Sequence, residues 1–101
     1  MASFLIDTDT GQVATLRQLM EAGIADAATG QAPRPWHPIR GTGDATTMWY
    51  AVMRKQERGI FIGTLVLRHT DHHASLLHSG WQEVPVEEIR QPKLGPSDPA
   101  G

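Results

Sequence analysis

Two neighbouring apolar stretches constrain the fold of this 101-residue chain more than any other feature. They are TTMWYAVMRK, residues 46–55, and GIFIGTLVLRH, residues 59–69. β-branched and aromatic residues are frequent in both, and few polar residues alternate with them, which favours strands covered on two faces. The segment QERG between them is typical of a hairpin connection. We therefore predict an antiparallel hairpin at the centre of the fold.

A strand and a helix are predicted before this hairpin. The run SFLID, residues 3–7, has the length of a strand, and DTDTGQ after it is rich in turn-forming residues. Thr15 and Gln18 have the spacing of a capping box. Apolar residues then recur on one helical face, so we expect an amphipathic helix over residues 16–28.

The segment RHTDHHASLLHSGW, residues 68–81, is compatible with a helix or a strand. In the helical interpretation Thr70 is the N-cap, Asp71 occupies the favourable N-terminal end and Gly80 ends the helix. WQEV predicts a short strand and PVEEIRQ a helical turn. The expected class is α+β: an antiparallel sheet of about four strands packed by one amphipathic helix, with a possible second short helix. A ferredoxin-like βαββαβ order is one arrangement that this allows.

The length suits one domain, which we place at residues 1–91. Residues 31–44, QAPRPWHPIRGTGD, contain three prolines and two glycines and predict an irregular loop. Residues 92–101, PKLGPSDPAG, have the composition of a C-terminal tail.

Composition excludes several classes of protein. The chain has no cysteine, so disulfides, thiolate catalysis and cysteine zinc sites are ruled out. A formal net charge of −2, with scattered Lys and Arg, argues against nucleic acid as the main partner. No apolar run reaches the roughly 20 residues of a membrane-spanning helix. The N-terminus lacks the pattern of a secretory signal, so we expect a cytoplasmic protein, or one incorporated into a particle assembled there.

Four of the five histidines lie between residues 69 and 78. Imidazole and carboxylate groups are ligands of divalent transition metals, and His69, Asp71 and His73 would share one face of a strand. The spacing matches no established ligand motif. A metal-binding enzyme or regulator is therefore one hypothesis, and surface histidines on a capped helix are the simpler alternative.

The stretch FLIDTDTG, residues 4–11, resembles the nucleophile strand of haloacid-dehalogenase-type phosphatases. The resemblance implies Asp7 as nucleophile and Asp9 as general acid/base. It covers about seven residues, and the chain is too short for the doubly wound core of that family. A turn built from Asp, Thr and Gly is the favoured interpretation.

The loop segment PRPWHPIR suggests contacts with a partner, because aromatic side chains dominate interface energetics. The candidate contact residues are Pro35, Trp36, His37, Pro38 and Arg40. In the alternative interpretation, the Trp36 ring packs back onto its own sheet.

These patterns favour a small non-catalytic protein that binds other proteins or copies of itself through a sheet edge and the Pro/Trp loop, without a cofactor. A phage or mobile-element particle subunit, or a small inhibitor of host machinery, has this profile. A metal-binding protein is the first alternative. A ligand-binding regulatory domain acting as a homo-oligomer is the second.

Overall fold

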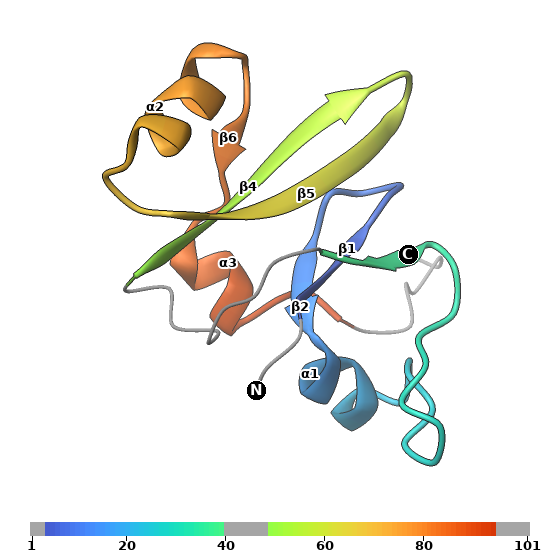
Figure 1. Cartoon of the computed structure of the whole chain (residues 1–101). Helices are drawn as coiled ribbons and strands as arrows, with labels where there is room; N and C mark the ends of the chain where they lie inside the picture. The colour runs from blue at the N-terminus through green and yellow to red at the C-terminus, as the bar shows by residue number, and fades with distance from the viewer. Residues whose placement is uncertain (1–3, 40–48, 95–101) are drawn as a thin grey trace.

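The computed structural model describes residues 4–39 and 49–94. Two three-stranded antiparallel sheets and three helices make up this part of the chain (Figure 1). The elements are β1 (Phe4–Asp7), β2 (Val13–Thr15), α1 (Leu16–Glu21), β3 (Trp36–Pro38), β4 (Tyr50–Glu57), β5 (Ile60–Leu67), α2 (Asp71–His78), β6 (Gln82–Glu83) and α3 (Val86–Arg90).

The α+β class is confirmed, but the ferredoxin-like order is not. One sheet has the strand order β2-β1-β3 and the other the order β5-β4-β6. The strands that we expected in one sheet of about four are thus divided between two sheets.

The predicted central hairpin is formed by β4 and β5. Its register runs from Tyr50 opposite Leu67 to Glu57 opposite Ile60. The two turn residues, Arg58 and Gly59, have φ angles of 53° and 85°. Positive φ at both positions is the mark of a type I′ turn, whose twist matches that of the flanking strands.

The helix α1 begins where the sequence predicts, and it ends early. Thr15 Oγ1 accepts from the Gln18 N–H at 3.1 Å, and Gln18 Oε1 accepts from the Thr15 N–H at 2.8 Å, which completes the capping box. The prediction that the helix continues to residue 28 is wrong, because Gly23 adopts a left-handed φ of 76°. Its N–H donates to Met20 O and the Ile24 N–H donates to Leu19 O, as in a Schellman cap.

The ambiguous histidine segment is helical. Thr70 caps α2 by accepting from the His73 N–H at 3.2 Å. The short strand β6 and the helical turn α3 also lie where the sequence predicts them. Within residues 4–39 and 49–94, no helix is long and apolar enough to span a bilayer.

The core joins both sheets. Residues from β1, β2, β4 and α3 share one buried cluster, and a second cluster lies beneath α1 on the other face of the first sheet. A third cluster, Ala51, Met53 and Val66, lies beneath α2. Arg54 also links the sheets, because its guanidinium donates to Gly11 O at 2.6 Å and forms an ion pair with Glu88 of α3. The β4–β5 hairpin is therefore covered by the first sheet on one face and by α2 on the other (Figure 1).

Candidate functional site

Four of the predicted contact residues lie in or next to β3, an edge strand of the first sheet. Trp36 is 9% exposed and packs in the cluster beneath α1, whereas His37 and Pro38 are exposed. The Trp36 ring thus follows the alternative interpretation and packs on its own sheet. Arg40 lies outside the described residues. A partner-binding role for this segment stays a prediction.

The outer edge of β3 is poor in hydrogen-bond donors. Ile39 N–H donates to Phe4 O and Thr8 N–H donates to Pro35 O, so every second pair of the β1–β3 ladder is hydrogen-bonded. This alternation directs the backbone groups of residues 36 and 38 away from β1. The Trp36 N–H donates to Pro33 O, and Pro38 has no N–H. An added strand would find carbonyl acceptors here and no donor from these two residues, a common protection of sheet edges.

The outer edge of β5 differs from that of β3. Ile60 closes a two-residue hairpin and the Arg68 N–H donates to Trp49 O, so the even-numbered residues of β5 face β4. The odd-numbered residues direct their backbone groups outward, and the Phe61 N–H donates to Thr8 O. The outward N–H groups of Gly63, Leu65 and Leu67 have no hydrogen-bond partner within the described part of the chain.

β5 is also the longest of the four sheet edges. It has eight residues, whereas the other edge strands β2, β3 and β6 have three, three and two. The sequence IFIGTLVL contains no charge and no proline, the features with which proteins commonly block strand addition.

A groove runs between the edges of β5 and β3. It has a volume of about 460 Å³, and we call it the edge groove. Its lining consists of Ile6, Thr8, His37, Pro38 and residues 60–64. This lining is largely apolar and contains neither Lys, Arg, Asp nor Glu. The edge groove therefore lies beside the first unpaired amide of β5, that of Gly63.

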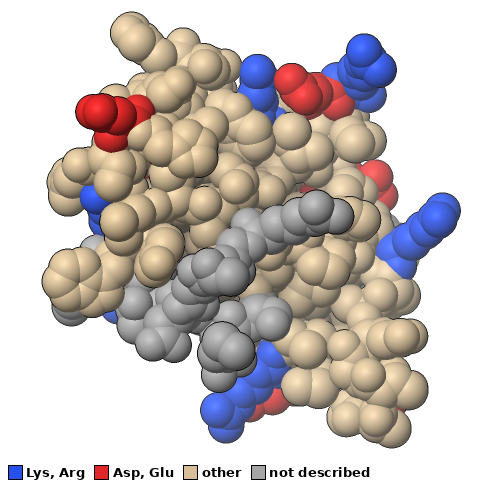
Figure 2. Space-filling model, viewed as in Figure 1, with Lys and Arg blue, Asp and Glu red and all other residues tan. Residues whose placement is uncertain are grey.

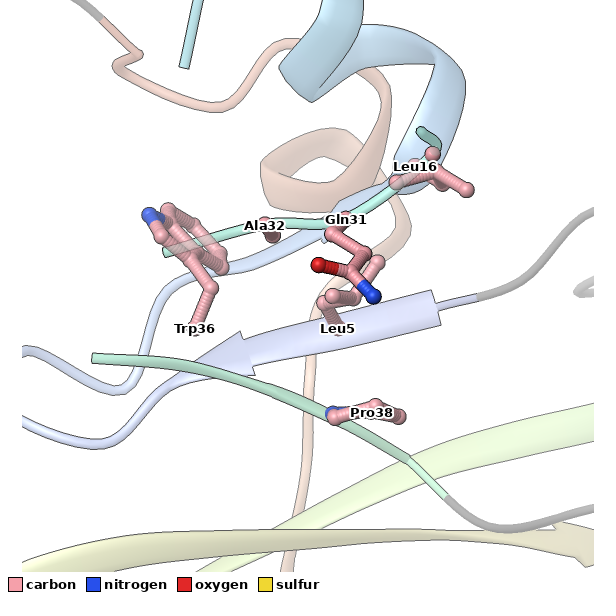
Figure 3. Close-up of a pocket in the computed structure, with 7 residues that line it drawn as sticks. Leu5, Leu16, Gln31, Ala32, Trp36 and Pro38 are labelled. Carbon is pink, nitrogen blue, oxygen red and sulfur yellow. The ribbon is translucent and has the colours of Figure 1, made fainter. Parts of the chain in front are cut away.

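A second cavity, of about 370 Å³, lies on the other side of β3. Trp36, Leu5, Leu16 and Pro38 supply its apolar lining. Figure 3 shows Gln31 extending from its backbone toward Leu5, which places its amide among these apolar groups. A third cavity, lined by Asp9 and Arg34 among others, adjoins the same strand. Cavities therefore lie on both sides of β3.

Sequence reasoning missed four large apolar side chains that are exposed in the described part of the chain. Trp49 is 63% exposed, Leu67 45%, Ile60 48% and Leu77 50%. Leu67 and Ile60 stand at the two ends of β5. The Lys, Arg, Asp and Glu side chains visible in Figure 2 lie mostly toward the outline of this face. The sequence predicts the apolar residues of β5 to be covered on two faces. The pattern of residues along a strand does not reveal which strand lies at the edge of a sheet, so the exposure of Ile60 and Leu67 could not be predicted.

The histidine segment forms a cluster between α2 and β6. His73 Nδ1 accepts from the His69 N–H at 3.2 Å, and His73 Nε2 lies 3.7 Å from Glu83 Oε1. Glu83 also pairs with Arg68 at 2.7 Å. His73 Nε2 is buried without a hydrogen-bond partner among the described residues.

The described residues contain no group of three His, Asp or Glu side chains arranged to hold a metal. His69 and His73 lie close together, with ring centroids 6.5 Å apart, but Asp71 is an exposed residue of the first turn of α2. Metal binding by His69, Asp71 and His73 stays a prediction, and elemental analysis of the purified protein tests it.

The stretch that resembles a phosphatase nucleophile strand forms a turn. Asp7 Oδ1 accepts from the N–H groups of Asp9 and Thr10, at 2.8 and 3.2 Å. One carboxylate oxygen of Asp7 is thus engaged in local backbone hydrogen bonds, as the turn interpretation expects.

Comparison with known protein families, curated proteins and solved structures finds no match for this chain.

Proposed function

We propose that this protein is a non-catalytic binding module that adds an extended strand of another polypeptide to the outer edge of β5. The observation that carries the proposal is the row of outward N–H groups at Gly63, Leu65 and Leu67, which have no partner among residues 4–39 and 49–94. In strand addition, such main-chain groups supply affinity, and adjoining pockets that receive alternate side chains supply specificity. These amides recur about every 6.8 Å along a strand, as the ladder of an added strand requires.

Two further features support this function. The edge groove lies beside Gly63 and offers an apolar site of about 460 Å³ for side chains of the added strand. Exposed Leu67 supplies an apolar contact at the far end of the same edge. An uncharged edge of eight residues without proline also lacks the usual obstacles to strand pairing.

A pull-down from the native source with three baits tests the function. The baits are the wild-type chain, Leu67→Lys at the edge and Leu77→Lys on α2. Leu67 and Leu77 are 45% and 50% exposed, so the two variants lose similar apolar surface and gain the same charge. We expect the wild type and Leu77→Lys to retain the same specific partner, and Leu67→Lys to lose it. Retention of that partner by Leu67→Lys to the wild-type level would contradict the proposal.

A further inference from the structure

The pattern of unpaired groups on β5 is complementary to itself. If two copies of β5 run antiparallel with Leu65 opposite Leu65, then Gly63 of one copy lies opposite Leu67 of the other. All three of these residues direct their N–H and C=O groups outward, and directly opposite residues of this kind exchange both hydrogen bonds. The register therefore pairs once each of the three amides that lack a partner in the described part of the chain. It leaves the Phe61 N–H on Thr8, where it is already bonded.

The side chains fit the same register. Directly opposite residues of an antiparallel pair lie on one face of the sheet. Phe61 and Leu65 pack against the cluster shared by the two sheets, so the odd-numbered residues of β5 face the first sheet. Ile39 and Ile6 already fill this face at Gly63 itself, where an added Cβ would lie 3.0 Å from Ile39 Cδ1. Leu67 of one copy would therefore lie beside Gly63 of the other, against the part of the edge groove that Ile6 and Pro38 line. Exposed Leu67 of each copy would thus contact the edge groove of the other copy, and the two-fold symmetry of the dimer makes this contact twice.

Charge does not oppose this arrangement. Residues 60–67 carry no charged side chain, so no like charges of the two strands meet across the junction. The other end of the same sheet is different, because β6 has only two residues and cannot offer a comparable ladder.

From these features, and resting on the proposed strand addition, we infer that the added strand is β5 of a second copy. Two β5 strands pair antiparallel about Leu65 and join the two β5-β4-β6 sheets into one six-stranded sheet. Each copy contributes one strand of eight residues, fewer than the roughly 20–30 residues a side of a standard interface, so we expect a weak dimer that forms at micromolar or higher concentration.

Cysteine cross-linking tests the register, because the natural chain has no cysteine. Opposite residues of a hydrogen-bonded pair have Cα atoms about 5.5 Å apart, within the range of a disulfide. Under mild oxidation Leu65→Cys should form a covalent dimer, whereas Thr64→Cys, which would lie opposite Val66, and Leu77→Cys on α2 should stay largely monomeric. Equal cross-linking of all three variants would overturn the inference.

Sedimentation of the cysteine-free chain gives an independent measurement. Leu67→Lys should raise the dissociation constant of the dimer about a hundredfold, because each of its two symmetric contacts loses about tenfold. Leu77→Lys should leave this constant unchanged. A chain that is monomeric up to millimolar concentration, or a dimer that persists in Leu67→Lys, would overturn the inference. If the chain is monomeric while the pull-down still depends on Leu67, the second-copy inference fails and the proposed function stands.

Discussion

Trp36 and Trp49 have opposite environments, so replacing each by alanine should change stability by very different amounts. Trp36 is 9% exposed and shares a buried cluster with Leu5, Ala14, Leu19 and Ala25, whereas Trp49 is 63% exposed. Truncation of a buried Trp to Ala usually lowers the free energy of unfolding by about 3–5 kcal/mol. The cavity of about 370 Å³ beside Trp36 means that part of the ring already borders open space. We therefore place the loss for Trp36→Ala near the lower end, about 3 kcal/mol.

For Trp49→Ala we expect a change within about 0.5 kcal/mol, as for other exposed positions. In a domain of this size, a loss of about 3 kcal/mol lowers the melting temperature by roughly 12–24 °C. Urea unfolding followed by far-ultraviolet circular dichroism measures both variants, and thermal melting provides a second estimate. Equal stability of the two variants, or greater loss in Trp49→Ala, would refute this account of the packing.

Two further predictions concern local geometry. Gly11→Ala places a Cβ 2.9 Å from the Phe61 ring at a φ of 79°, whereas Gly30→Ala has a φ of 70° and nothing within 4 Å. Urea unfolding should show that Gly11→Ala costs about 1–3 kcal/mol more than Gly30→Ala, since only the former adds a steric clash, and equal costs would count against the packing of Phe61 on this turn. Thr70→Ala removes the N-cap of α2 and the Thr70 hydroxyl bond to Leu67 O, so it should lower the free energy of unfolding by about 1 kcal/mol or more. The same assay measures this loss, and an unchanged stability would show that the cap contributes little.

Elements with strong local signals could be predicted from the sequence. The apolar runs and the Arg58–Gly59 turn specify the β4–β5 hairpin, and the spacing of Thr15 and Gln18 specifies the start of α1. These signals act between residues close in the chain, where propensity and capping chemistry decide the outcome.

Elements decided by tertiary contacts could not be predicted. The three residues of β2 are too few to show alternation, and they form a strand because they pair with β1. Trp36 to Pro38 read as an irregular loop because of the prolines, yet β3 exists as an edge strand, where proline is tolerated. Which tryptophan is buried depends on the packing beneath α1, and no pattern local to either residue reveals it.

The candidate site was predicted in part. The sequence pointed to a sheet edge and to the segment around Trp36, and residues 37 and 38 do line the edge groove. The edge on which the proposal rests belongs to β5, whose sequence is typical of a central strand because its residues are apolar on both faces. Its position at an edge follows from the separation of the two sheets, a long-range property of the fold.

Amide hydrogen exchange at Gly63, Leu65 and Leu67 tests the central claim most directly. The amides of β4 residues that are bonded to β5, such as that of Lys55, provide an internal control. In the dilute free chain the three edge amides should exchange rapidly, and in the bound state their exchange should slow by at least about tenfold, as hydrogen bonding to an added strand requires. Binding that leaves all three amides at their free rates would contradict strand addition at β5.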